Sequence, residues 1–378
     1  DKLKHQFPDI FSQAVTTKPL HNYQAKLTLI DFPYTKPKAY FTTGSNKEAI
    51  RTYIQQSLEN GLIKTIESDE LVAMSPIFAL PQKNGKIRII TDLRKINRHL
   101  QYTPRPIPPT ASILPELSQK TIFSVVDIRK AYQQIPLKGH KLGLITQFGS
   151  YKFTRLPYGL AAAPYWWGEF IDKIISTIDL PKGTIVKYYY DDIIIASEEK
   201  KEHIQILYKL FDTLNKNGLS ISEEKLQLAT TIIEFLGYEL SYNRIAIQQE
   251  KKDTIKRWVQ PTSKEGIIKF IGFTNFLRQF IPETSRLLKP FYEIAKIKKN
   301  TDGEDSNKAH LTQQATKSFN EIKQLITRSL TLKIFDPQQR CVIYSDASLE
   351  GASAVLFQPE YNEGREQLYP IAFYSVCF

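Results

Sequence analysis

Two adjacent carboxylates, Asp191 and Asp192, interrupt the apolar and aromatic run IVKYYYDDIIIAS at residues 185–197. The flanking residues are strong strand formers, which predicts a β-hairpin with the acidic pair at its tip. An ionised carboxylate in a low-dielectric interior is unstable unless it is paired or bound to a metal ion, so we expect positive charge nearby. Because strand side chains alternate between faces, the two acids should point in different directions. An ordinary turn at tolerant positions is the plain alternative.

The composition indicates a soluble globular chain of more than one domain. Its 378 residues exceed the length at which a single core stops growing, and hydrophobic and charged residues make up 42% and 24%. No apolar run is long enough to span a membrane, so no membrane partner is expected. The two cysteines, Cys341 and Cys377, exclude a disulfide framework and a cysteine-rich zinc site.

The net charge of +12 predicts a polyanionic partner. Charge alone leaves nucleic acid, an acidic protein and an anionic membrane open. The 20 Tyr, 21 Phe and 3 Trp residues favour nucleic acid, because bases stack on aromatic rings. Most of these aromatic side chains are nevertheless expected to fill the core.

Capping and hydrophobic periodicity predict the helices. Ser45 and Glu48 form a capping box that predicts a helix over 45–61. A helix over 201–217 carries an apolar stripe that begins at Ile204 and is predicted to face the core. The other predicted elements are a helix over 159–177 and strands over 76–81, 86–92 and 122–126. Strands and helices alternate irregularly, which predicts an α+β fold with an antiparallel sheet.

Asp127 stands at the end of the predicted strand 122–126, as Asp191 stands at the tip of a hairpin. We expect both carboxylates to meet at one edge of a common sheet. Such a pair can hold two Mg²⁺ ions about 4 Å apart, one activating an attacking hydroxyl and the other stabilising the leaving phosphate oxygens. The charge of the metal ions would make acids in an apolar run tolerable.

Several motifs follow one another in the order and approximate spacing seen in reverse transcriptases. They are SVVDIRKAYQQI at 124–135, RLPYGLAAAP at 155–164, YYDD at 189–192, FLGY at 235–238 and FIGFTNFLRQFIP at 270–282. The chain resembles most closely the reverse transcriptases of gypsy-type LTR retrotransposons and of related retroviruses and pararetroviruses. The resemblance spans residues 7–378, and the ordered set of motifs is highly specific.

The resemblance implies a right-hand polymerase fold, with fingers, a palm built on an antiparallel sheet and a helical thumb, followed by an incomplete RNase H-like α/β segment. The implied divisions are fingers and the start of the palm over 1–120, palm over 121–245 with a fingers insertion at about 128–157, thumb over 246–295, linker over 296–308, and a partial RNase H-like or connection segment over 309–378.

The resemblance assigns the catalytic and metal-binding roles to Asp127, Asp191 and Asp192. Two Mg²⁺ ions are the implied cofactor, with Mn²⁺ as an alternative. Lys225 matches a lysine thought to protonate the leaving pyrophosphate, which is a general-acid role. A solvated lysine at the start of a strand is the plainer interpretation.

The resemblance also implies nucleotide and primer contacts. Tyr132 matches the aromatic steric gate that excludes a 2′-hydroxyl, and an aromatic core residue is the alternative. The implied dNTP-binding residues are Lys83, Arg88, Tyr132, Tyr158 and Gly159. The implied primer and template contacts are Tyr189, Leu236, Gly237, Asn275 and Arg278. In the motif PYWWGEF the chain departs from the family, with Trp166 and Trp167 in place of a smaller residue and Phe, and Gly168 in place of a frequent Gln.

The C-terminal motifs IYSDAS, GASAVLFQ and YPIAFYS resemble the first three strands of an RNase H domain. Asp346 matches the first of the four carboxylates of that domain. One carboxylate cannot build a two-metal site, so no RNase H activity is expected from this chain alone. The terminal sheet is expected to expose an apolar face.

We therefore expect an RNA-directed DNA polymerase that acts on RNA/DNA and DNA/DNA template-primers with dNTPs. The resemblance implies processing from a Pol polyprotein and a cytoplasmic location in virus-like particles, and it leaves a homodimer or association through the C-terminal sheet open. Two alternatives remain: a domesticated, catalytically silent nucleic-acid-binding or assembly module, and a DNA-directed polymerase with the same palm.

Overall fold

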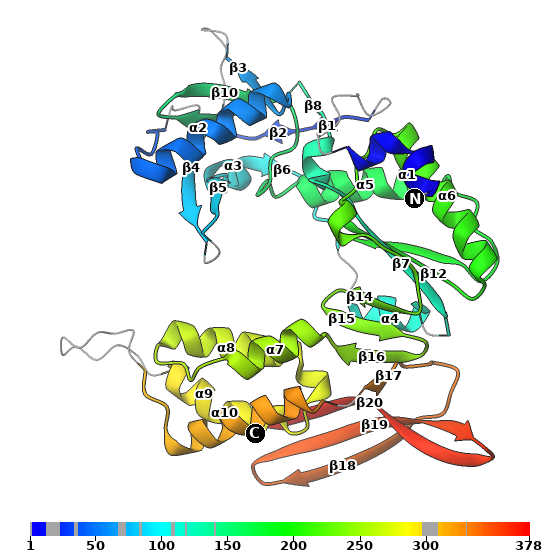
Figure 1. Ribbon diagram of the computed structural model, residues 1–378. Coiled ribbons are helices and arrows are strands. Elements are labelled where there is room, and N and C mark those ends of the chain that lie inside the picture. Colours follow the sequence, from blue (N-terminus) through cyan, green and yellow to red (C-terminus); the bar gives the residue numbers. More distant parts are fainter. Residues whose placement is uncertain are drawn as a thin grey trace. The chain divides into compact units, whose positions relative to one another are not determined.

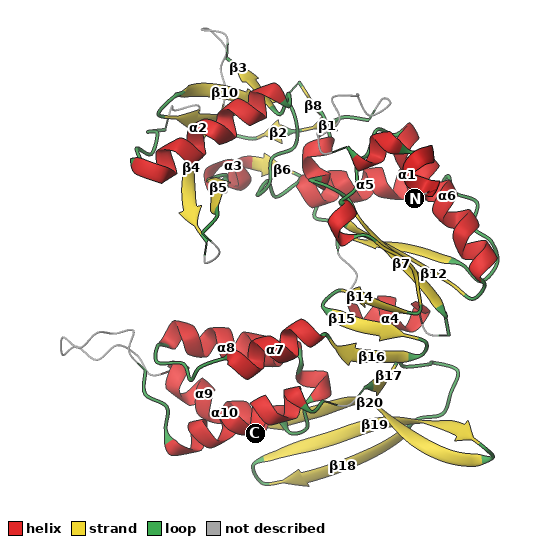
Figure 2. Ribbon diagram, in the orientation of Figure 1, coloured by secondary structure: helices red, strands yellow, loops and turns green. Residues whose placement is uncertain are grey.

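The computed structural model describes most of the chain, which divides into two compact units. The described residues are 2–12, 23–33, 37–66, 73–82, 85–106, 110–117, 119–139, 141–296, 309–329 and 331–378. The first unit contains Asp1–Ile107 and Ser124–Ala229, and the second contains Pro108–Phe123 and Thr230–Phe378. Figure 1 labels the elements of each unit, and Figure 2 distinguishes helices from strands.

One sheet of the first unit has five strands. They are β3 (Ile63–Thr65), β4 (Ala73–Pro81), β5 (Ile87–Thr91), β9 (Leu142–Thr146) and β10 (Gly149–Phe153), in the order β3-β10-β9-β4-β5. Strand β4 pairs in parallel with β9 and antiparallel with β5. Helix α2 (Gly44–Glu59) buries Ile50 and Ile54. The sheet therefore combines one parallel pair with the predicted antiparallel hairpin.

The predicted hairpin and first helix are present, with one error. Strands β4 and β5 lie where strands over 76–81 and 86–92 were predicted, and Lys83, between them, lies outside the described residues. Helix α2 begins at Gly44 after Thr43, and no side chain caps its first N–H groups. The predicted capping box is wrong because Ser45 already lies inside the first helical turn, past the position from which a side chain caps a helix.

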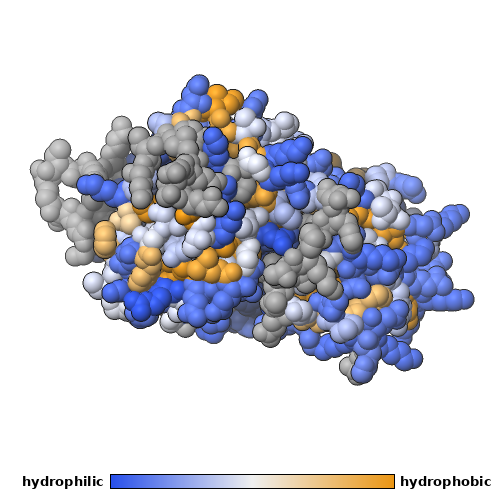
Figure 3. All heavy atoms as spheres, turned by 90° about the horizontal axis from the view of Figure 1, so that it is seen from above, coloured by the Kyte–Doolittle hydropathy of each residue, from blue (hydrophilic) through white to orange (hydrophobic). Residues whose placement is uncertain are grey.

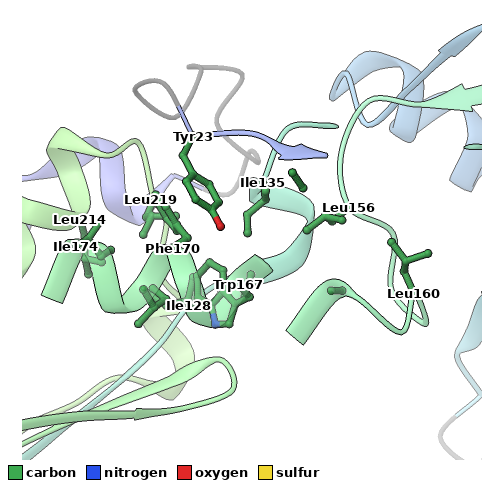
Figure 4. Close-up of a cluster of buried hydrophobic side chains, with 14 of the residues drawn as sticks. Tyr23, Ile128, Ile135, Leu156, Leu160, Trp167, Phe170, Ile174, Leu214 and Leu219 are labelled. Atoms are coloured by element: carbon green, nitrogen blue, oxygen red, sulfur yellow. The ribbon is translucent and has the colours of Figure 1, made fainter. Parts of the chain in front are cut away.

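The second sheet of the first unit carries both predicted acidic segments. Its strands are β7 (Ile122–Asp127), β11 (Ile185–Tyr189), β12 (Asp192–Ser197) and β13 (Gln227–Thr230), in the order β11-β12-β7-β13. The central strands β7 and β12 are the most buried. Helices α5 (Ala163–Ile175) and α6 (Lys200–Lys216) contribute to the same core, and Figure 4 shows Trp167, Phe170 and Leu214 within it.

Helix α6 turns a different side chain toward the core from the one predicted. Ile204 is 40% exposed, whereas its neighbour His203 is fully buried. The His203 ring nitrogens lie 2.7 Å from Ser124 Oγ in β7 and 3.1 Å from Ser197 Oγ in β12. Because the two hydroxyl groups satisfy both nitrogens, a polar residue occupies this buried position at little cost.

The remaining elements of the first unit are short. They are α1 (Lys2–Gln6), η1 (Pro8–Phe11), β1 (Ala25–Lys26), β2 (Thr28–Leu29), α3 (Arg94–His99), β6 (Leu100–Gln101), η2 (Ala131–Gln134), β8 (Leu137–Lys138) and η3 (Glu223–Lys225). Strand β1 pairs with β8 and β2 with β6, so the N-terminal stretch is tied to later parts of the chain.

The second unit joins a four-stranded sheet to a group of helices. The strands, antiparallel and in chain order, are β14 (Ile232–Phe235), β15 (Tyr238–Ser241), β16 (Arg244–Ile247) and β17 (Leu332–Lys333). The helices are α4 (Thr110–Leu117), α7 (Gln249–Arg257), α8 (Lys264–Phe276), η4 (Arg278–Phe280), α9 (Thr284–Lys296) and α10 (Gln313–Thr327). The ring of Phe270 packs 5.0 Å from Phe291 and 4.9 Å from Phe319, which joins α8, α9 and α10.

A three-stranded antiparallel sheet completes the second unit. Its strands are β18 (Val342–Ser348), β19 (Gly351–Asn362) and β20 (Arg365–Cys377). These are the three strands predicted from the C-terminal motifs. Strand β20 contacts the start of α9, where Ser285 N donates to Ser375 Oγ at 2.9 Å. Apolar side chains are exposed on this sheet, among them Ile343 at 64% and Tyr374 at 59%.

The arrangement of helices and strands fits the predicted α+β class, because they alternate irregularly along the chain and most of the paired strands are antiparallel. The predicted linker over 296–308 falls almost entirely on residues outside the described ranges. None of the described helices is both long and apolar enough to cross a membrane. Figure 3 shows a mostly hydrophilic face with hydrophobic side chains in small separate patches.

Candidate active site

The hairpin formed by β11 and β12 places the acidic pair at its turn. Tyr189 pairs with Asp192, so the two turn residues are Tyr190 and Asp191. The predicted tip is therefore displaced by one residue, because Asp192 already belongs to the ladder. Tyr190 has a φ of 53°, a left-handed conformation that is unfavourable for most residues other than glycine. The turn is held in this conformation by contacts outside the hairpin.

Asp127 and the hairpin acids meet at one end of the same sheet. The backbone N–H of Ile128, next to Asp127, donates to the carbonyl oxygen of Asp191 at 2.8 Å. The charge of Asp127 acts on both Asp191 and Asp192, so the three carboxyl groups lie close together. Three carboxyl groups that lie far apart in the sequence therefore form one cluster, which we call the acid cluster.

The acid cluster carries more negative than positive charge, because one ammonium group, that of Lys225, acts on its three carboxyl groups. Desolvation and the charge of Asp127 raise the pKa of Asp191 to about 6, and Lys225 offsets part of this effect. Desolvation and Asp127 likewise raise the pKa of Asp192 to about 6. Asp191 Oδ1 is buried without a hydrogen-bond partner. A carboxylate in such a position favours a bound cation, because desolvation without a counter-charge opposes ionisation.

Lys225 supplies the nearest counter-charge. Its Nζ donates to Asp127 Oδ2 at 2.9 Å. The hydrogen bond to Asp127, together with the three carboxylates, raises the pKa of Lys225, so the ammonium form is favoured. The Lys225 side chain is 69% exposed while that of Asp127 is 14% exposed. The Lys225 side chain is therefore largely solvated, as the plainer interpretation predicts, and its Nζ also contacts the acid cluster, as a general acid would.

The predicted nucleotide-binding tyrosines lie beside the acid cluster. The Tyr132 and Tyr158 rings contact each other edge to face, with centroids 5.4 Å apart. Burial, followed by the charge of Asp191, raises the pKa of both phenols, so both are protonated donors. Arg88 is exposed on β5, and its charge slightly opposes the rise in the pKa of Tyr158. Gly159 has a φ of 88°, which allows the sharp turn after Tyr158.

The residues of the acid cluster fit divalent cations by their chemistry. Within the described residues, no group of three or more His, Cys, Asp or Glu side chains is already arranged to hold a metal ion. The cluster nevertheless offers acceptor-only carboxylate oxygens, which Mg²⁺ prefers. Asp191 Oδ1 is a buried acceptor without a hydrogen-bond donor, and such an oxygen fits a bound cation. Asp127, Asp191 and Asp192 are the residues that would hold it.

The predicted primer contacts Leu236 and Gly237 form a tight turn in the second unit. They join β14 to β15 with φ values of 51° and 83°. A Cβ on Gly237 would lie 2.9 Å from Lys251 Nζ and from Phe276 Cζ, so a side chain would displace both. Glycine is thus required by the backbone conformation and by the close approach of α7 and α8. Lys251 beneath this turn was not predicted, because its contact depends on the packing of α7.

Asn275 and Arg278, the other two residues predicted to contact the primer or template, make hydrogen bonds with residues of the same unit. Asn275 Nδ2 donates to Tyr292 Oη at 2.8 Å. Arg278 Nη2 donates to the Ser375 carbonyl at 3.3 Å, and its guanidinium lies 5.5 Å from the Tyr374 ring. Asp346 is exposed on β18 and lines a surface pocket of about 190 Å³ together with Arg286 and Lys289 of α9. These residues are not part of the acid cluster.

Two residues that contact the hairpin of β11 and β12 were not assigned roles from the sequence. Trp167 Nε1 donates to the Tyr190 carbonyl at 2.6 Å. Arg105 Nη2 donates to Tyr188 Oη at 2.8 Å and forms an ion pair with Asp172. Trp167 stood out only as a departure from the family pattern, and Arg105 lies in a proline-rich connector without a distinctive signal.

Comparisons with known proteins agree with this fold and its motifs. Residues 80–240 match the family model described as reverse transcriptase (RNA-dependent DNA polymerase), and residues 311–378 match the RNase H-like domain found in reverse transcriptase. The Tf2-7 and Tf2-3 transposon polyproteins of Schizosaccharomyces pombe are 27% and 28% identical over 377 aligned residues, and each alignment covers 98% of this chain. The chain spans 27% of the length of these relatives.

Solved structures with a similar fold include the foamy viral protease-reverse transcriptase. The form in complex with an RNA/DNA hybrid has a TM-score of 0.81 and 23% identity, covering 100% of this chain and 49% of that one. The form in complex with double-stranded DNA has a TM-score of 0.80 and 23% identity, covering 100% of this chain and 64% of that one. The predicted polymerase fold, followed by an RNase H-like segment, is confirmed.

These findings define the class as a reverse transcriptase joined to an RNase H-like domain. Residues 80–240 form the part of the chain that matches the reverse transcriptase (RNA-dependent DNA polymerase) family, and residues 311–378 form the part that matches its RNase H-like domain. Its relatives are polyproteins of transposons, so the predicted relationship to LTR retrotransposons is confirmed.

Proposed function

We propose that this chain is the polymerase portion of a retrotransposon polyprotein and that it extends a primer 3′-hydroxyl with dNTPs on RNA and DNA templates. The observation that carries the proposal is the acid cluster, in which Asp127, Asp191 and Asp192 converge with a deficit of positive charge. Reverse transcriptases generally use divalent metal ions. When bound by these residues, two Mg²⁺ ions would supply Lewis-acid activation and charge neutralisation for nucleotidyl transfer.

The residues of this chain would contribute to the reaction through position and protonation. Asp127, Asp191 and Asp192 bring negative charge to the end of the sheet, where a triphosphate needs counter-ions. Lys225 holds a proton at Nζ beside Asp127, which suits it to protonate the leaving pyrophosphate. Its exposure keeps the ammonium accessible to solvent, so it can be reprotonated after each turnover.

Tyr132, Tyr158 and Arg88 would bind the incoming nucleotide. A guanidinium matches phosphate oxygens bidentately, which suits Arg88 for the triphosphate. The Tyr132 ring is braced by Tyr158 and close to Asp191, so it would exclude a 2′-hydroxyl from the sugar position. Lys83 is proposed as a second phosphate contact on the same hairpin.

The template-primer would be bound mainly through its phosphates, which agrees with the net charge of +12. The Leu236–Gly237 turn presents backbone without a bulky side chain and is proposed to contact the primer strand. The foamy viral structures contain an RNA/DNA hybrid or double-stranded DNA, which supports both kinds of duplex as ligands.

Incorporation of labelled dNTPs on a primed RNA template tests the proposal. The wild-type chain should extend the primer in Mg²⁺, and Asp191→Asn should not, while both bind the duplex with similar affinity. Asn preserves the shape of Asp and removes the charge, so loss of extension would report on the cluster rather than on folding. A silent nucleic-acid-binding module would bind the duplex equally well and incorporate nothing in either form.

A further inference from the structure

The turn that carries Asp191 is strained and yet fixed. Tyr190 adopts a φ of 53° although it is an aromatic residue, and its ring is 42% exposed, so the ring itself is not anchored in the core. Left-handed backbone at such a residue persists only where surrounding contacts hold it. The hydrogen bonds to the two carbonyl groups of this turn identify those contacts.

Each carbonyl of the turn has a separate donor. Trp167 Nε1 donates to the Tyr190 carbonyl at 2.6 Å, and Ile128 N donates to the Asp191 carbonyl at 2.8 Å. Trp167 is 1% exposed and packs within the core shown in Figure 4, 6.1 Å from the Phe170 ring. A buried, rigid indole therefore holds one side of the turn, and the strand that ends in Asp127 holds the other.

The neighbour of Trp167 on α5 holds the strand that leads into the turn. Tyr188 Oη donates to the Gly168 carbonyl at 3.3 Å and accepts from Arg105 Nη2 at 2.8 Å. A Cβ on Gly168 would lie 2.7 Å from both Cδ and Nε of Arg105. The glycine thus leaves space for the arginine. Consecutive residues of α5 contact the hairpin at Tyr188 and at Tyr190.

The Trp167 hydrogen bond acts directly on the position of Asp191. The Tyr190 carbonyl and the Asp191 N–H belong to the same planar peptide group. Fixing that oxygen therefore limits rotation of the whole peptide plane and sets the direction in which the Asp191 side chain leaves the backbone.

We propose that Trp167 is a positioning residue, whose indole N–H orients Asp191 toward Asp127 for catalysis. The inference rests on the proposed polymerase function for its kinetic consequences. It gives α5 a second role besides filling the core.

Three substitutions separate this role from packing. Trp167→Phe removes the donor and keeps an aromatic ring. Incorporation of benzothienylalanine at 167 keeps the bicyclic shape and replaces the N–H with sulfur. Trp166→Phe is the matched control, because its ring contacts Tyr23 and Tyr165 rather than the hairpin. Each protein is measured by active-site titration and by single-turnover extension.

The proposal predicts that both changes at 167 slow single-turnover extension about ten- to a hundredfold, the effect of a small misplacement of a reacting group. The fraction of active molecules and the affinity for dNTP should remain close to wild type, and Trp166→Phe should behave as wild type. A packing role would instead reduce the active fraction and leave the rate of the active molecules unchanged. That result, or a wild-type rate with benzothienylalanine, would overturn the proposal.

Hydrogen–deuterium exchange provides a readout that does not depend on catalysis. Amides in residues 185–197 should exchange faster in both variants at 167 and at the wild-type rate in Trp166→Phe. If the wild-type chain extends no primer, the proposed function fails, while exchange still decides whether Trp167 holds the hairpin. Unchanged exchange at 185–197 in all three variants would contradict the inference on its own.

Discussion

The two units each contain a cluster of charged side chains, and the clusters differ in how their charges are balanced. In the first unit, the acid cluster sets Asp127, Asp191 and Asp192 against Lys225. The second unit contains a cluster formed by Arg244, Lys333 and Glu360, which we call the ion cluster. In the acid cluster, the buried Asp191 Oδ1 has no hydrogen-bond partner. In the ion cluster, both carboxylate oxygens of Glu360 accept hydrogen bonds from Arg244.

The ion cluster shows what a structural arrangement of buried charges requires. Arg244 Nη1 and Nη2 donate to the two carboxylate oxygens of Glu360, each at 2.6 Å. The Lys333 side chain is 0% exposed, and its Nζ donates to Gln339 Oε1 at 2.8 Å and to the Pro359 carbonyl at 2.9 Å. Buried charges that serve stability are paired and hydrogen-bonded in this way. A cluster that is not paired is a candidate for ligand binding.

The largest effect should come from neutralising an acid in the acid cluster. Asp127→Asn removes a proposed metal ligand, and loss of about 4 kcal/mol of transition-state stabilisation slows primer extension about a thousandfold. Glu360→Gln, which also neutralises one carboxylate, should leave the extension rate per folded molecule unchanged. Quantitative primer extension at saturating dNTP checks both variants. Equal losses of rate in both would remove the functional difference between the clusters.

The free energy of unfolding should be lowered by Glu360→Gln, a change that leaves the extension rate unaltered. Glu360→Gln removes the anion from the partly exposed Arg244 and from the buried Lys333, and an uncompensated buried ammonium costs about 3 kcal/mol. Lys333→Met replaces the buried ammonium with an apolar side chain of similar length and leaves the bidentate Arg244–Glu360 pair intact. We expect its free energy of unfolding to be close to wild type, as measured by urea denaturation. The interpretation fails if Lys333→Met is the more destabilised of the two.

His203 provides a third case, a buried group satisfied by hydroxyl groups rather than by charge. Burial lowers its pKa to about 4, so the folded state favours the neutral ring. The neutral imidazole of His203 contributes fully to the free energy of unfolding above the pKa of the unfolded state, about 6.5. This contribution is lost as the pH falls toward 4, and the total loss is about 2 to 3 kcal/mol.

Asp191 and Asp192 have the opposite sign in the same range, because their raised pKa values favour the folded state as the pH falls below about 6. The comparison should therefore be between wild type and His203→Gln, in which the acid contribution is the same. The free energy of unfolding of His203→Gln, relative to that of wild type, should therefore rise as the pH falls from 6.5 to 4.5, because only wild type loses the contribution of the neutral imidazole. Parallel curves would show that His203 does not titrate on unfolding.

Much of the fold follows from local patterns in the sequence. The hairpin around the acidic pair, the strand ending at Asp127 and the helix over 201–217 were predicted because strand formers and apolar periodicity are local signals. The side chains that face the core were predicted less well. Ile204 is more apolar than His203, yet His203 is buried, because two serines from separate strands supply its hydrogen bonds.

The candidate site was predicted through the carboxylates and not through the contacts that orient them. Asp127 and Asp191 were chosen because acids in apolar runs require compensation. The contact of Lys225 with Asp127 and that of Trp167 with Tyr190 join residues 98 and 23 positions apart, and no local pattern encodes such pairs. The position of the hairpin turn, one residue earlier than predicted, likewise depends on these long-range contacts.

The smallest effect is also the most direct test of the claim that the acid cluster is built to bind cations. The measurement is the thermal unfolding midpoint of wild type, Asp191→Asn and Glu360→Gln, first in EDTA and then during titration with Mg²⁺. Because burial raises the pKa of Asp191, its charge destabilises the fold without metal, and Asp191→Asn should be more stable in EDTA by about 1 to 2 kcal/mol after solvent screening. Mg²⁺ should then raise the midpoints of wild type and Glu360→Gln by the same increment and leave Asp191→Asn nearly unchanged. An equal Mg²⁺-dependent rise in Asp191→Asn would contradict the account.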